Sequence, residues 1–68
     1  MGQGELLMIK LIADAIKEAG PEGIPSGFLW AALMTRFSGL AAYESYIALL
    51  IRAGIVRQDG GHILRFVG

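Results

Sequence analysis

The sequence predicts a small α+β domain in which three helices are followed by a C-terminal β-hairpin. Three observations support this fold class. Apolar residues recur at helical spacing in three stretches, Gly and Pro separate these stretches, and two β-prone runs flank an Asp-Gly-Gly turn at residues 59–61. Glycine accepts the positive φ that tight hairpin turns require. A chain of 68 residues is long enough for one such domain, which we expect to span residues 1–68.

The composition limits the classes of protein to which the chain can belong. Hydrophobic residues make up 54% of it before glycine is counted, whereas soluble domains average about 45–50% with glycine included. Charged residues interrupt every long apolar run, which argues against a membrane span. The absence of Cys rules out disulfides and thiolate metal sites. We expect a cytoplasmic protein, because no basic region precedes an apolar stretch as in a signal peptide.

The first helix is expected over residues 5–19, after a flexible N-terminus at residues 1–4. Gly20 suits the C-terminal end of this helix, and Pro21 prevents the helix from continuing. The charged side chains of the helix cluster on one narrow face, so apolar side chains cover a wider arc than a core requires. We therefore expect two apolar surfaces on this helix, one for the core and one for a partner.

The second helix is expected over residues 26–35, and Ser26 stands at its N-cap position. Ile24 precedes a proline and is therefore pushed out of the α region, so one or two extended residues are expected there. The helix carries no charge before Arg36. Its surface is consequently apolar on almost every side.

The third helix is expected over residues 39–53, with Ser38 as its N-cap. Its core arc contains Leu40, Tyr43, Tyr46, Ile47, Leu50 and Ile51. The opposite arc contains Ala41, Ala42, Glu44, Ser45, Ala48, Leu49, Arg52 and Ala53. The hairpin is expected over residues 55–67, and strand alternation places Leu64 and Phe66 on the same face of it.

The chain resembles the winged helix-turn-helix superfamily in its element order and in one stretch, Leu49-Leu50-Ile51-Arg52-Ala53-Gly54-Ile55-Val56, which is similar to the junction between the third helix and the wing. The resemblance covers residues 5–67. It implies a three-helix winged helix-turn-helix whose C-terminal β-hairpin is the wing. Members of this superfamily commonly bind DNA with the third helix, and others use the scaffold only for protein contacts. The resemblance therefore leaves both kinds of partner open.

The residues favour a non-catalytic module that works through protein contacts, including a homodimer. The outer arc of the third helix offers small side chains that suit close approach of another helix. Its sole cation is Arg52, which Glu44 opposes, so it is poorly suited to reading bases. The alternative is that Ala only raises helix propensity there. The candidate interface residues are Met8, Leu11, Ala15, Phe28, Trp30, Met34 and Leu49. For Trp30 the alternative is a place in the core.

The second hypothesis is a small DNA-binding transcriptional regulator that uses the third helix and the wing. Its candidate nucleic-acid contacts are Arg36, Ser45, Arg52, Arg57, His62 and Arg65. The formal net charge is zero, which favours ordinary solvated arginines over a phosphate-binding surface. His62 has no second His and no Cys as a neighbour, so we expect a solvated wing side chain rather than a ligand or a base.

No catalytic function is expected. Asp14 and Glu18 have the spacing of paired carboxylates, but Lys10 and Lys17 lie within one turn of Asp14, so a solvated charged face is the better interpretation. The glycines near the N-terminus lack the third glycine of a dinucleotide-binding motif and follow no strand. No nucleophile–base pair and no metal-ligand constellation is visible. We therefore expect no enzyme, cofactor, metal ion, small-molecule substrate or membrane partner.

Overall fold

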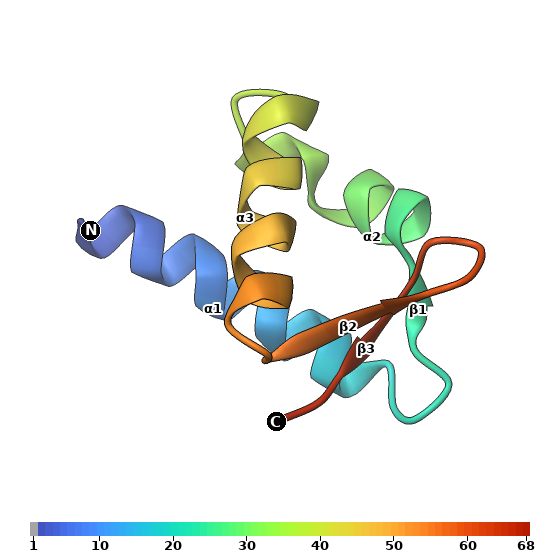
Figure 1. Cartoon of the computed structure of the whole chain (residues 1–68). Helices are drawn as coiled ribbons and strands as arrows, with labels where there is room; N and C mark the ends of the chain where they lie inside the picture. Colours follow the sequence, from blue (N-terminus) through green and yellow to red (C-terminus); the bar gives the residue numbers. More distant parts are fainter. Residues whose placement is uncertain (1) are drawn as a thin grey trace.

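A computed structural model describes residues 2–68 of the chain. Its elements are α1 (Gln3–Glu18), β1 (Ile24–Pro25), α2 (Ser26–Leu33), the 3₁₀ helix η1 (Met34–Arg36), α3 (Leu40–Arg52), β2 (Val56–Asp59) and β3 (Ile63–Phe66). Figure 1 shows α3 crossing α1, with the hairpin of β2 and β3 extending from the end of α3. The predicted fold class is confirmed: the chain is an α+β, three-helix winged helix-turn-helix with a C-terminal β-hairpin wing.

The three strands form one antiparallel sheet in the order β1-β3-β2. Ile24 pairs with Leu64, so the short strand expected at Ile24 is present. Asp59 pairs with Ile63, and the three residues between them close the hairpin. The turn lies one residue later than predicted, over residues 60–62, because Asp59 belongs to β2 and His62 has a positive φ of 59°. His is among the side chains that enter this left-handed region more readily than most.

The core lies where the three helices meet the inner face of the sheet. Its buried side chains are Ile12, Ile16, Leu29, Tyr43, Ile47, Leu50, Val56 and Leu64. Burying each large apolar side chain stabilises the fold by about 1.5–3 kcal/mol. Leu40 was expected in the core arc but is 48% exposed, because it is the first residue of α3 and lies at the edge of the core.

The start of α1 differs from the expectation. The helix begins at Gln3, so residues 3 and 4 are helical rather than part of a flexible segment, while Met1 lies outside the described residues. The cause is the carboxylate of Glu5, whose Oε1 accepts a hydrogen bond from the Gly2 backbone N–H at 3.3 Å. A carboxylate in the first turn also interacts favourably with the helix dipole.

The other two helices start and end close to the expected residues, but neither predicted serine is the N-cap. Pro25 holds that position for α2, and the Ser26 N–H donates to the His62 carbonyl at 2.9 Å. Gly39, in extended conformation, precedes α3, so Ser38 lies one residue too early to cap it. The predicted second helix also changes to the 3₁₀ helix η1 at Met34.

Ser26 has a different role, since it joins α2 to α3 and to the hairpin. The Tyr43 hydroxyl donates to the Ser26 carbonyl at 3.0 Å and lies 3.4 Å from the Ser26 hydroxyl. Burial raises the pKa of Tyr43, although the Ser26 hydrogen bond opposes this change, so the hydroxyl stays protonated and available as a donor at neutral pH. Ser26 is thus a junction of the fold.

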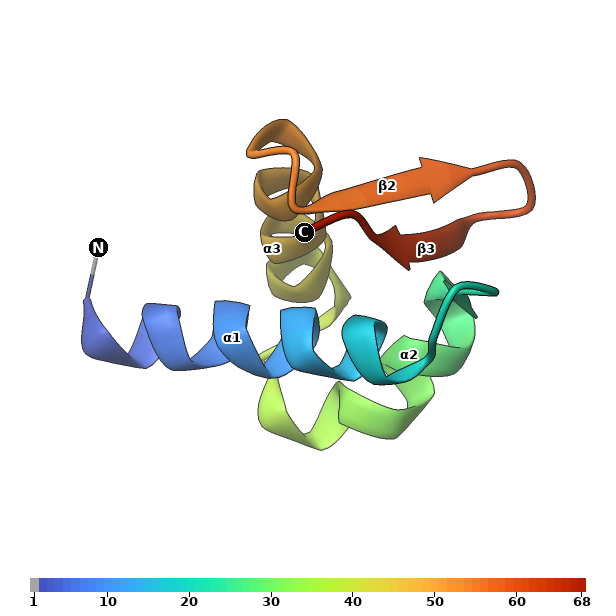
Figure 2. The same ribbon diagram turned by 90° about the horizontal axis from the view of Figure 1, so that it is seen from below.

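The N-terminal half of α1 extends past α3, on the side away from the hairpin, in both Figure 1 and Figure 2. Leu6 and Leu7 lie on this part of the helix and are exposed. No helix within residues 2–68 reaches the combination of length and hydropathy that crossing a membrane requires. The overhang, like α2, carries large apolar side chains that are exposed.

Candidate interaction site

The outer surface of α2 and of the first two residues of η1 carries no charged side chain, and the exposed Arg36 follows it at the end of η1. We call this surface the α2 face, and it consists of the exposed residues Gly27, Phe28, Ala31, Ala32, Met34 and Thr35. Phe28 is 73% exposed and Met34 is 49% exposed. Large exposed apolar side chains that lie together usually mark a contact site, and aromatic residues and Met are enriched at the centres of interfaces. The predicted interface residues Phe28 and Met34 are therefore accessible for contact.

An aromatic cluster supports this face from below. The ring centroid of Trp30 lies 5.2 Å from that of Tyr43 and 6.3 Å from that of Phe37. Phe37 in turn lies 5.6 Å from Tyr43 and 5.8 Å from Tyr46. Aromatic pairs at these distances stabilise one another beyond their burial. Trp30 is half-buried and packs against the core, so the core interpretation accounts for most of its contacts, and its interface role stays a prediction.

The remaining predicted interface residues are less accessible than expected. Met8, Leu11 and Leu49 are half-buried, and Ala15 packs against the core. Leu6 and Leu7, which were not among the predicted residues, are the exposed apolar side chains of α1. The buried Ile12 and Ile16 show which side of α1 faces the core. Helical periodicity from these two residues puts Leu7 on the opposite side, so their spacing could have identified it in the sequence.

The outer face of α3 is exposed along its whole length. We call it the α3 face, and its exposed residues are Ala41, Glu44, Ser45, Ala48 and Arg52. The Ser45 hydroxyl donates to the Ala41 carbonyl at 2.9 Å, so its hydrogen is used within the helix. Arg52 is the single cation of this face, and Glu44 offsets its charge. This is a poor surface for reading bases, because Arg52 is its one side chain of the kind that forms bidentate contacts with purine edges.

A shallow groove separates α3 from the hairpin. It is lined by Ser26, Glu44, Ile47, Ala48, Ile51, Gln58 and His62. The amide nitrogen of Gln58 lies 3.0 Å from Nδ1 of His62, so the exposed His62 is held by a neighbour in the wing. Glu44 is the one formally charged side chain in this lining, and a carboxylate repels phosphate. The groove therefore favours neutral or cationic groups over a nucleic-acid backbone.

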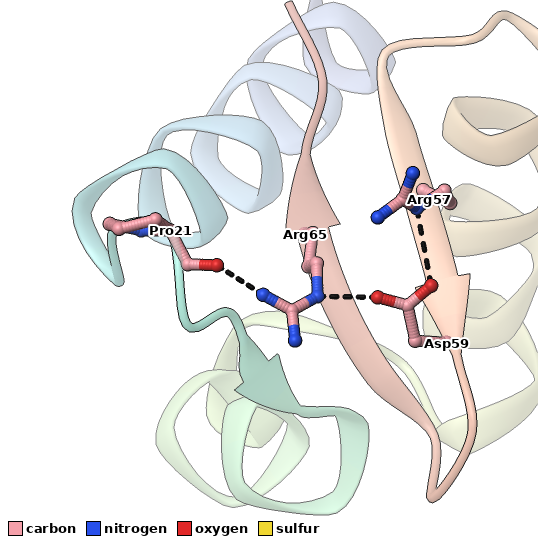
Figure 3. Close-up of polar contacts among 4 residues, drawn as sticks. All are labelled: Pro21, Arg57, Asp59 and Arg65. Atoms are coloured by element: carbon pink, nitrogen blue, oxygen red, sulfur yellow. Dashed lines mark hydrogen bonds and ion pairs between the residues drawn. The ribbon is translucent and has the colours of Figure 1, made fainter.

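The wing arginines are paired with a carboxylate of the wing itself (Figure 3). The Arg65 guanidinium donates to Asp59 and to the Pro21 carbonyl, and the Arg57 Nε lies 3.1 Å from the other oxygen of Asp59. Arg57 and Arg65 face each other directly across β2 and β3, where like charges repel. Asp59 offsets this repulsion. We call these four residues the wing cluster.

The charge state of Asp59 follows from this geometry. The hydrogen bond from Arg65 holds the pKa of the Asp59 carboxyl below its ordinary value of 3.8, and Arg57 acts in the same direction, while partial desolvation opposes both. The carboxylate is therefore ionised at neutral pH, and the three ionic side chains of the wing cluster sum to a single positive charge. The geometry makes Arg65 a link between β3 and the turn after α1, since Pro21 belongs to that turn.

The other predicted nucleic-acid contacts lie apart from one another. Arg36 ends η1, Arg52 ends α3, and both are exposed. The ion pairs formed within residues 2–68 involve Asp14 or Asp59, and neither Arg36 nor Arg52 takes part in one. No group of three His, Cys, Asp or Glu side chains in the described part of the chain is arranged to hold a metal ion.

No protein-family model, curated protein or solved structure shows a significant match to this sequence. The α2 face, the α3 face and the wing cluster are therefore the features from which a function can be inferred.

Proposed function

We propose that this chain is a non-catalytic winged-helix module that acts through protein contacts, including contact with a second copy of itself. The observation that carries the proposal is the α2 face, on which Phe28 is 73% exposed and no residue is charged. In a helix-turn-helix that binds DNA, the helix before the recognition helix crosses the sugar-phosphate backbone. A surface without a cation is unsuited to that position, whereas it is well suited to burial against another protein.

Two further features support protein contacts. Arg57 and Arg65 form ion pairs with Asp59, and Arg65 also donates a hydrogen bond to the Pro21 carbonyl. A phosphate would therefore have to compete with an internal carboxylate for these arginines. The groove between α3 and the hairpin carries Glu44 where a phosphate would have to pass. Together they leave little positive surface for the electrostatic binding that dominates protein–DNA affinity.

The proposal is tested by placing a photo-crosslinking amino acid at the α2 face. We expect Phe28→p-benzoylphenylalanine in the full chain to give protein adducts on irradiation in the native host. The matched control replaces Glu18, which is exposed on the charged side of α1, with the same amino acid. Adduct yields at position 28 no higher than those at position 18, or adducts only with nucleic acid, would count against the proposal.

A DNA-binding regulator is the second candidate, because Arg36 and Arg52 are exposed and are in no ion pair of the described chain. A titration with mixed-sequence duplex at low salt tests it. We expect no saturable binding. Binding that falls steeply as salt is added, and falls again in the variant Arg36→Ala/Arg52→Ala, would favour this candidate over protein contacts.

A further inference from the structure

The α3 face carries a charge pattern that matches a rotated copy of itself. Glu44 lies four residues before Ala48, and Arg52 lies four residues after it. Both charged side chains are exposed, and the ion pairs formed within residues 2–68 leave both without a partner. An isologous helix contact requires a self-complementary surface, and an exposed acid and an exposed base at equal distances from one small residue provide one.

Helix geometry shows why the match works. Four residues span about 6 Å along the axis and leave an offset of about 40° around it, in opposite senses for Glu44 and Arg52. A two-fold axis that lies in the contact plane at the level of Ala48, perpendicular to α3, places a second helix opposite the first, reverses the axial offset and keeps the lateral one. The rotation therefore brings Glu44 of one copy level with Arg52 of the other, where these two long side chains bridge the remaining lateral offset across the contact. The same pairing occurs a second time on the other side of Ala48.

We propose that the α3 face binds a second copy of this chain, with the two α3 helices antiparallel and the two-fold axis at Ala48. The inference rests on the proposed function and names the partner for one surface. Two Glu44–Arg52 pairs fix the direction and the register of the helices, because like charges would meet in a parallel arrangement or a shifted one.

The neutral residues of the face are compatible with this arrangement. Ala48 lies at the axis, where the helices approach most closely, and a methyl group permits a short distance between helix axes. Burial of Ser45 leaves no donor unsatisfied, since its hydroxyl already donates to the Ala41 carbonyl. The same contact covers the surface with which a winged helix would read DNA, so self-association and base contacts by α3 exclude each other.

The test is a set of charge reversals followed by sedimentation equilibrium, from micromolar to millimolar concentration. We expect a wild-type dimer. Glu44→Arg places an arginine against Arg52 of the second copy at both contacts, so the dissociation constant rises roughly tenfold or more. Arg52→Glu places a carboxylate against Glu44 of the second copy at both contacts, so the dissociation constant should rise by a similar factor. The double variant Glu44→Arg/Arg52→Glu restores a dissociation constant within about threefold of the wild type, because both pairs are re-formed in reverse.

The two single variants provide a sharper control when they are mixed. Each variant fails to pair with itself. In a mixed dimer the Glu44→Arg side chain faces the Arg52→Glu side chain at one contact, and the native Arg52 and Glu44 face each other at the other contact. We expect an equimolar mixture to form a heterodimer. Glu18→Arg, which makes the same change of net charge on an exposed site of α1, leaves the wild-type dimer intact. Circular dichroism of each variant establishes that the chain is folded.

Several results would overturn the inference. If the wild-type chain stays monomeric up to millimolar concentration, the proposed dimer does not form. Charge reversals that leave the dissociation constant unchanged, or a mixture that stays monomeric, place the contact elsewhere. If Glu44→Arg does not fold, Ala48→Glu must weaken the dimer instead, because it sets two carboxylates against each other at the axis. The crosslinking yield at position 28 is independent of all these results, so the proposed function is judged separately.

Discussion

The outer face of the hairpin carries two arginines whose charges are met inside the molecule, whereas the α2 face carries no charge and no internal partner for its largest side chain. Arg65 contacts Asp59 and Pro21, and Arg57 contacts Asp59. Phe28, by contrast, extends into solvent. The polar side chains of the wing cluster thus link elements of the fold, while apolar side chains of the helices remain exposed.

The largest difference in unfolding free energy is expected between substitutions of Leu64, a wing residue in the core, and of Phe28, the exposed residue of α2. Leu64 is fully buried and Phe28 is 73% exposed. Leu64→Ala should lower the free energy of unfolding by about 2–5 kcal/mol, because it leaves a cavity in the core. Phe28→Ala should change it by less than about 0.5 kcal/mol. Urea unfolding measures both, and comparable losses would show that Phe28 serves the fold rather than a partner.

A second contrast tests how closely the wing packs against the turn after α1. Gly23 has a φ of 76°, and a Cβ added there would lie 2.6 Å from the Leu64 carbonyl oxygen. Gly23→Ala should therefore cost about 2–4 kcal/mol of unfolding free energy, from strain and steric overlap together.

The matched control is Gly20→Ala. Gly20 also has a positive φ, of 81°, but no atom lies within 4 Å of the added Cβ. Only backbone strain remains, so the expected loss is about 1 kcal/mol. Equal losses at the two positions would mean that the close contact between the turn and β3 is not maintained in solution.

The smallest expected effect concerns the charge of the wing cluster. Because the pKa of Asp59 is lowered in the folded chain, its ion pairs stabilise the fold above the pKa of the unfolded chain and stop doing so as the pH falls through the lowered value. Asp59→Asn should therefore destabilise the chain at neutral pH. The difference from the wild type should shrink in acid, where the wild-type carboxyl is protonated as well.

Asp59→Asn also releases both wing arginines, so it should raise the affinity for duplex DNA at low salt. Asp14→Asn is the control, since Asp14 pairs only with the exposed Lys10, at 3.5 Å on α1. The control should change neither property measurably. Unchanged DNA affinity in Asp59→Asn would show that the carboxylate does not restrain these arginines.

Local patterns in the sequence were sufficient to predict the fold. The spacing of Ile12 and Ile16, and of Tyr43, Ile47 and Leu50, follows helical periodicity, and the glycines of the turn identify the hairpin. The ends of the helices were predicted within a few residues. The N-cap predictions at Ser26 and Ser38 were wrong because a cap depends on the backbone geometry of one or two residues.

The candidate site was predictable only in part. The lack of charge on α2 was visible in the sequence, and it led to Phe28 and Met34. The pairing of Arg65 with Pro21 was not visible, because 44 residues separate them and only the packing of the turn against β3 brings them together. Exposure of Leu7 in place of Leu11 likewise depends on which side of α1 the other elements cover.

We propose that the helical faces contact proteins, whereas the arginines of the wing cluster are occupied by Asp59 and Pro21. Nitrogen–proton correlation spectra of the labelled chain test this claim most directly, recorded over a range of protein concentrations and then with duplex DNA at low salt. We predict concentration-dependent shifts on the α3 face, centred on Ala48, and no shifts at Arg57 or Arg65 when DNA is added. Spectra that do not depend on concentration, together with DNA-induced shifts in the wing and along α3, would contradict the claim.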